Sequence, residues 1–550
     1  MNVALAQAGV SVDQSWLDYL IIGIYFVFVL GIGALLRSRM RSSEDYLMAG
    51  RSLPSWVTGL GFLGANLGAL EIMGMGAGAA QYGIMQAHFY WIGAIPAMVF
   101  IALFMMPFYY GSRTHSVPGF LKLRYNEATR GFNAVMFGII TILMSGINMY
   151  AMAIVFQLLL GWTLTASIFL SAAIIMGYIL LGGLASSIYN EVLQFFLILL
   201  GLVPLVFLGL RDVGGWSGLQ EAVNRPEFFH LWANTGSADA NPMAVEWFAI
   251  VLGLGFVLSF GYWCTDFIVV QRALAAEDEA AAERTPLIAA FPKILFGILA
   301  IFPGLIVLSV IPDLGQGGGG LANSYNMAIP LAMANYFPSG MLGIGLVALL
   351  AAFMSGMAGN VTAFNTIWTY DIYRAYISRD RPDRHYLNVS RYATVWGVLL
   401  SIAAAYVVTQ FESMMDYVQT LLSFYTAPLF ATFLLGMFWK RATPWGGFVG
   451  MVSGTLTATV LYLMELFGAI TFGSAMAGNF WRAWWVWVVC FVVTIVVSFL
   501  TTPKPDSELR GLVWSLTEKK EAVERSWYKK PWVLGVAAIA ITVVLNIIFF

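Results

Sequence analysis

The chain alternates long apolar runs with short polar connections along most of its 550 residues. A helix needs about 20 mostly apolar residues to cross a bilayer, because each residue adds only about 1.5 Å of length. Fourteen segments meet this requirement, so we predict an all-α polytopic membrane protein. The predicted spans cover residues 17–36, 54–82, 88–110, 131–160, 164–181, 188–210, 244–270, 287–311, 340–373, 389–410, 414–438, 445–467, 482–501 and 532–549.

The basic residues test this number of spans. Lys and Arg concentrate in cytoplasmic loops. If the loops alternate from an outside N-terminus, nearly all of the 28 Lys and Arg residues fall on one side. The other side receives only Arg211, Arg225 and Arg482, and Lys293 lies within a span. We therefore expect an integral protein of the plasma (inner) membrane with both termini outside.

The second span is interrupted by glycine. Residues 59–80 read GLGFLGANLGALEIMGMGAGAA, with Asn66 and Glu71 among the glycines. Gly weakens a helix by about 1 kcal/mol per position relative to Ala, and a carboxylate at bilayer depth is costlier still. The pattern favours a discontinuous helix whose free backbone groups face a solute and ion site, as in secondary transporters. The alternative is a Gly-rich helix that packs closely against its neighbours.

A second interruption occurs in the seventh span. Residues 253–266 read GLGFVLSFGYWCTD, and Asp266 ends the run, either at a break or simply at the cytoplasmic end of its helix. Spans 2–6 and 7–11 each open with an interrupted helix, which is typical of a five-plus-five inverted-repeat transporter core. An odd repeat gives the halves opposite topology. The alternative is two accidental Gly clusters.

This repeat predicts five regions along the chain. Residues 1–52 hold the outside N-terminus, a flanking helix and an inner loop, and residues 53–210 form the first five-helix repeat. An outer loop, 211–243, precedes the second repeat, 244–438, and three flanking helices occupy 439–550.

The ninth span has a thin face of small residues. Its middle reads LLAAFMSGMAGNVTAFNTIW, so another helix can approach closely, and Ser355 offers a hydroxyl oxygen. A hard monovalent cation is held by several oxygen ligands, here neutral carbonyls and hydroxyls, which the broken second span and this span could supply together. The alternative is that Ser355 bonds back to its own helix.

Composition narrows the class of protein. The chain is 60% hydrophobic and 10% charged, against about 25% charged in soluble domains. Cys264 and Cys490 lie in distant spans, and the four His residues are scattered, so we expect no disulfide framework or metal cluster. The first residues have no basic region, so we expect no cleaved signal peptide.

Other functions are disfavoured. No GxxxxGK[ST] motif occurs, so a primary pump is disfavoured, and we expect neither enzymatic activity nor a nucleic-acid partner. A channel would need a pore loop, and a membrane sensor would need more than the short 502–531 loop for a signalling domain. Membrane lipid, a small solute and a coupling ion are the expected partners, and the oligomeric state stays open.

Several ordered motifs resemble the sodium:solute symporter family, and its sugar-transporting branch most of all. They are SEDYLMAGRSLPSW (43–56), GANLGA (64–69), EIMGMGAG (71–78), VPGF (117–120), GGLASSIYNEVLQ (182–194), YWCTDFIVVQRALAA (262–276), AFNTIWTYDIYRAY (363–376) and FLLGMFWKRAT (433–443). The resemblance implies sodium-coupled symport by alternating access. The alternatives are proton-coupled or uncoupled transport of a charged solute such as a carboxylate or an amine, or a transporter-like sensor.

The resemblance also implies a sodium site. Its ligands would be the backbone carbonyls of Gly64, Leu67 and Ala352 and the hydroxyl of Ser355. The family commonly has a second hydroxyl residue directly after that Ser, whereas this chain has Gly356. One ligand is therefore missing or replaced by water. Whether transport is coupled to sodium or to protons stays open. Glu191 matches an acidic residue on the inner sodium exit route; otherwise it is a snorkelling interfacial carboxylate.

Eight positions match the family's solute pocket. Tyr262 matches the aromatic that closes the pocket from inside, and Glu71 stands where sugar symporters tend to have Gln. A sugar or polyol is the favoured solute, and a charged solute is the alternative. Glu71 contacts the solute or pairs with Lys293 across the cavity. The eight positions are Asn66, Glu71, Tyr90, Asn148, Ser259, Tyr262, Lys293 and Gln419, of which Tyr90 replaces an acidic residue and Ser259 an Asn.

Overall fold

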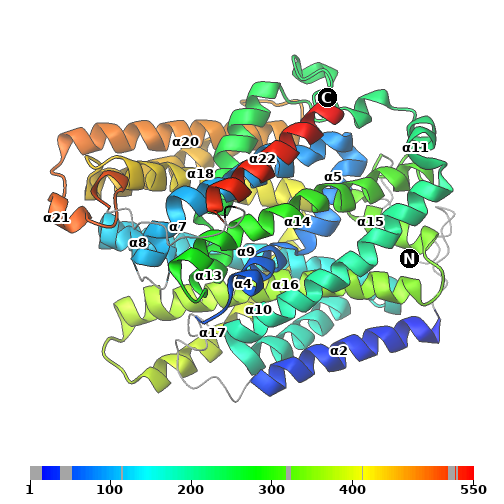
Figure 1. Cartoon of the computed structure of the whole chain (residues 1–550), viewed down its shortest axis with the longest axis horizontal. Coiled ribbons are helices and arrows are strands. Elements are labelled where there is room, and N and C mark those ends of the chain that lie inside the picture. Colours follow the sequence, from blue (N-terminus) through cyan, green and yellow to red (C-terminus); the bar gives the residue numbers. More distant parts are fainter. Residues whose placement is uncertain are drawn as a thin grey trace.

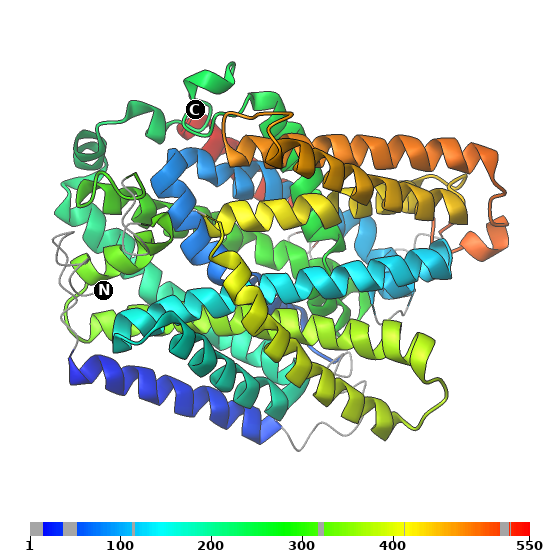
Figure 2. The same ribbon diagram turned by 180° about the vertical axis from the view of Figure 1, so that it is seen from behind.

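The computed structural model is built of helices throughout the part of the chain that it describes, apart from one isolated bridge between Leu53 and Ala276 (Figures 1 and 2). It describes residues 15–36, 52–112, 116–316, 324–411, 413–517, 527 and 530–550. The all-α prediction is therefore confirmed. Most of the glycine-rich run LGQGGGG (residues 314–320), and the inner loop after the first span with its Arg residues, lie outside the described residues.

The helices follow the predicted spans closely. Among the described residues, ten helices are long and apolar enough to cross a membrane, two further spans are bent pairs of helices, and two shorter apolar helices occupy the remaining predicted segments. The helices are α2 (Trp16–Leu36), α4 (Ser55–Asn66), α5 (Met75–Tyr82), α6 (Ile95–Phe100), α7 (Met106–Gly111), α8 (Val117–Arg124), α9 (Glu127–Leu160), α10 (Leu164–Asp212), α11 (Gly215–Val223), α12 (Phe260–Thr265), α13 (Phe267–Leu274), α14 (Glu279–Ile306), α15 (Ala328–Tyr336), α16 (Met341–Thr366), α17 (Asp383–Val408), α18 (Met414–Phe438), α19 (Pro444–Leu466), α20 (Ala475–Leu500), α21 (Asp506–Leu509) and α22 (Pro531–Ile548).

Wider helical turns occur beside both expected interruptions and also in other helices. π-helical segments cover Leu70–Gly74, Phe89–Ala94, Ile101–Met105, Ala249–Ser259 and Ile367–Ile377. Such segments are rare and occur often at functional sites. One difference from the prediction is that spans 164–181 and 188–210 fall within a single helix, α10.

Both predicted interruptions are present. The helix axis bends by 66° between α4 and the helical run Leu70–Ala87, and by 45° between the run Ala249–Thr265 and α13. Asp266 lies at the second break, where its carboxylate accepts the backbone N–H of Ile268 at 2.8 Å. It therefore caps α13 rather than marking the end of the span.

Helix α16 forms the centre of the bundle. In the run 341–377, 89% of the apolar stretch is buried, against 17% in α22 at the periphery. At its start, Asp18 of α2 accepts the backbone N–H groups of Gly340 and Gly343 at 2.9 and 2.7 Å, which satisfies donors that a helix N-terminus leaves free. This contact ties the flanking helix to the helix that carries Ser355.

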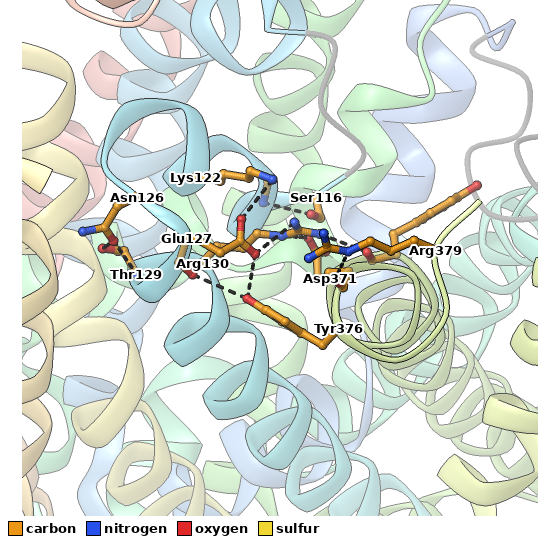
Figure 3. A network of polar contacts seen from close by, with 12 residues as sticks. Ser116, Lys122, Asn126, Glu127, Thr129, Arg130, Asp371, Tyr376 and Arg379 are labelled. Atoms are coloured by element: carbon orange, nitrogen blue, oxygen red, sulfur yellow. Dashed lines mark hydrogen bonds and ion pairs between the residues drawn. The ribbon is translucent and has the colours of Figure 1, made fainter. Parts of the chain in front are cut away.

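A polar network holds the other end of this long run (Figure 3). Arg130 of α9 pairs with Asp371 at 2.9 Å, and Glu127 accepts the hydroxyl of Tyr376 at 2.7 Å. Lys122 of α8 joins the network through Glu127 at 2.9 Å. Helices α8 and α9 therefore fix the segment Ile367–Ile377 that continues α16.

Candidate solute and sodium sites

A small cavity lies where the broken helices meet. The cavity has a volume of about 50 Å³. Six of the eight predicted solute residues line it: Glu71, Tyr90, Ser259, Tyr262, Lys293 and Gln419. Sequence reasoning missed the apolar part of the wall, which comprises Leu70, Met75, Phe89, Ala94, Leu254, Leu258, Trp263, Met415 and Leu422.

The two charges in this wall neutralise each other. Lys293 of α14 forms an ion pair with Glu71, at the start of the second half of the broken span. Their side chains are 1% and 11% exposed. The hydroxyl of Tyr90 donates to Glu71 Oε2 at 2.7 Å, so the carboxylate has two partners. Of the two roles left open for Glu71, the structure shows the pairing with Lys293.

The ammonium of Lys293 has further partners. It donates to Asn66 Oδ1 at 2.5 Å. It also lies 4.5 Å from the ring centroid of Tyr90 and 5.1 Å from that of Trp263, within the range of cation–π attraction. A buried charge is tolerated only when it is paired and hydrogen-bonded, and Lys293 meets both conditions.

Asn66 joins the two broken helices. It is the last residue of α4, it does not line the cavity, and its amide nitrogen donates to the hydroxyl of Tyr262 in α12 at 3.0 Å. Asn66 and Tyr262 therefore connect the cavity wall to the first helix break, two residues from Gly64.

The proposed sodium ligands gather at this break. The hydroxyl of Ser355 donates to the carbonyl of Gly64 at 2.8 Å, and Ser355 is fully buried. Leu67 ends α4 with backbone angles outside the helical region, and Ala352 lies one turn before Ser355 in buried α16. Oxygens of α4 and α16 thus approach each other where the chain breaks, which is the chemistry that a hard monovalent cation requires.

Asn148 lies at the break and not in the cavity wall. Its Oδ1 accepts the backbone N–H of Ala69 at 2.8 Å, a donor freed by the interruption of the helix. Asn148 is a predicted solute residue, but it does not line this cavity, because that N–H holds its side chain at the helix break.

Glu191 is buried against α4, close to the first helix break. Its side chain is 0% exposed and forms an ion pair with Arg272 of α13, and it accepts the hydroxyl of Ser187 at 2.8 Å. A Cβ atom added to Gly64 would lie 2.9 Å from Glu191 Cβ, so α4 packs directly on this residue. The interpretation of Glu191 as a snorkelling side chain is wrong, since no part of it reaches the surface.

Comparison with known proteins identifies the family. The model of the sodium:solute symporter family matches residues 46–454. The chain belongs to the sodium:solute symporter family. Its relatives include the sodium/glucose cotransporter of Vibrio parahaemolyticus, 26% identical over 97% of this chain and 98% of the relative. Sodium/glucose cotransporter 2 of Rattus norvegicus is 28% identical over 92% of this chain and 82% of the relative.

A solved structure supports the fold. A Na⁺-coupled sialic acid symporter in a substrate-bound outward-open state superimposes with a TM-score of 0.75 and 18% identity, over 89% of this chain and 99% of that chain. The predicted five-plus-five inverted-repeat fold is confirmed. The protein is an integral membrane transporter and not an enzyme, and sodium is the coupling ion of its family.

Proposed function

We propose that the protein is a sodium-coupled symporter of a small, uncharged polar solute, a sugar or polyol, working by alternating access. The observation that carries this proposal is the Glu71–Lys293 ion pair in the cavity wall. The expected setting is the plasma membrane with both termini outside.

The ion pair favours a neutral solute because it leaves the cavity without net charge. A carboxylate or an amine would add a net charge to a site enclosed by apolar helices, where an unpaired charge costs several kcal/mol. A neutral solute adds none, and the ion pair can stay closed while the solute binds.

The remaining polar groups suit hydroxyl groups. Ser259, Tyr262 and Gln419 line the cavity, and each has a hydroxyl or amide that both donates and accepts. Both hydrogen bonds that Glu71 accepts through its carboxylate use Oε2, so Oε1 keeps its acceptor capacity among the described residues. A polyhydroxylated solute can satisfy such groups while its carbon skeleton contacts Trp263 and the apolar wall.

The relatives support this class. The Vibrio parahaemolyticus and Rattus norvegicus proteins are named as sodium/glucose cotransporters, and they align with nearly the whole chain. Glu71, Tyr90 and Ser259 depart from the pattern of sugar symporters, so we infer a solute that shares the chemistry of hexoses.

A counterflow screen tests the solute class. Purified protein in vesicles preloaded with a candidate should exchange it for a labelled trace of the same compound. We expect exchange with a neutral sugar or polyol and none with sialic acid, simple carboxylates or amines. Exchange restricted to a charged solute would contradict the proposal and favour the alternative of a charged substrate.

A further inference from the structure

The break in the second span contains an oxygen atom beyond the four proposed ligands. Asn148 of α9 is 7% exposed, and its Oδ1 lies where α4, the run Leu70–Ala87 and α16 meet. The amide is oriented by two contacts, since Oδ1 accepts the N–H of Ala69 and Nδ2 donates to the carbonyl of Met144 at 3.4 Å. This assigns the oxygen, and not the nitrogen, to the break.

Two glycines make room for this oxygen. A Cβ atom added to Gly356 would lie 2.4 Å from Asn148 Oδ1, and one added to Gly68 would lie 2.5 Å from it. The two glycine backbones also touch, because the added Cβ of Gly356 would lie 2.9 Å from Gly68 Cα. Asn148 Oδ1 therefore fills the volume that a side chain at position 356 would need.

The neighbours of these glycines are the proposed ligands. Gly68 directly follows Leu67, and Gly356 directly follows Ser355. A carbonyl oxygen has two lone pairs, and among the described residues Asn148 Oδ1 accepts one hydrogen bond, from the N–H of Ala69. One acceptor position thus remains on a neutral oxygen beside the sodium ligands.

We propose that Asn148 Oδ1 is a further ligand of the sodium ion, in place of a hydroxyl at position 356. Gly356 then does not weaken sodium binding, because the amide of Asn148 in α9 supplies the oxygen that α16 lacks. This inference rests on the proposed sodium site.

Two double variants test the proposal by exchanging the source of the oxygen. The measurement is the sodium-dependent rise in the thermal unfolding temperature of the purified protein, with potassium as the control for ionic strength. Asn148→Ala should weaken sodium binding by about tenfold or more, the effect of losing one polar contact. Asn148→Ala/Gly356→Ser should regain most of that loss, because the hydroxyl can enter the vacated volume. Asn148→Ala/Gly356→Ala has no added oxygen and should stay weak.

The pair of double variants separates ligation from packing. Both lack the amide that holds Ala69 and both carry a Cβ at position 356, so only the hydroxyl distinguishes them. Equal sodium binding by the two would overturn the proposal, as would normal binding by Asn148→Ala. Gly356→Ser alone should give no gain, because its Cβ meets Asn148 Oδ1; tighter sodium binding would contradict the proposal. An absence of sodium binding in the parent protein would instead contradict the proposed function.

Discussion

Glu71 and Lys293 act as a unit at the residue scale. Removing one partner leaves the other charge buried without compensation, which costs about 3–5 kcal/mol. We expect Glu71→Gln and Lys293→Met each to lower solute binding at least tenfold, and the double variant to be milder than either. Solute binding and thermal unfolding of all three variants measure this coupling. Additive losses would contradict it.

The exposed ion pair Lys122–Glu127 is a matched control for this double-mutant cycle. Its side chains are 50% and 42% exposed, and such pairs contribute about 0–1 kcal/mol. Glu127→Gln should therefore leave solute binding unchanged, although Glu127 also accepts a hydrogen bond from the hydroxyl of Tyr376.

At the level of helices, the ion pair of Glu191 with Arg272 joins α10 to α13. Glu191 and Arg272 are both fully buried, and Glu191 packs against the α4 backbone at Gly64. We expect Glu191→Gln to destabilise the protein by about 3–5 kcal/mol, and Glu191→Leu/Arg272→Met to recover most of this, since apolar side chains replace a buried ion pair well. Thermal unfolding with and without sodium measures the loss of stability and its recovery. A Glu191→Gln variant of parent stability that releases sodium more slowly would instead support the role of Glu191 in ion exit alone.

Topology is a prediction at the scale of the whole molecule. The uneven distribution of Lys and Arg places the loop 211–243 outside and the loop 502–531 inside. Ser237 and Ser507 are exposed in these loops, and the native Cys264 and Cys490 are buried. Ser237→Cys should react with an impermeant thiol reagent in intact cells, and Ser507→Cys should react only after permeabilisation. The same accessibility for both would contradict the predicted topology.

The sequence predicts most of the fold because spans and breaks are local. Apolar length fixes each span, and glycine with Asp266 fixes the two interruptions. The pairing of Glu71 with Lys293 could be raised only as an alternative, because it depends on how α14 packs against the broken span. The partner of Glu191 could not be predicted at all, since Arg272 follows it by 81 residues along the chain.

The position of the Asn148 side chain also could not be predicted from the sequence. A motif can assign a residue to a pocket, but the direction of its side chain depends on which backbone donor the break leaves free. Trp263 in the cavity wall gave only a weak signal, since apolar aromatic residues are frequent in every span.

In the proposed mechanism a sodium gradient drives solute uptake. Solute accumulation is measured in vesicles that hold the purified protein, with the membrane potential clamped and the solute chosen by counterflow. We predict accumulation above the external concentration under an inward sodium gradient, but not under a potassium or proton gradient, and its loss in Ser355→Ala. Simple equilibration of the solute under the sodium gradient, or accumulation driven by protons alone, would contradict the account.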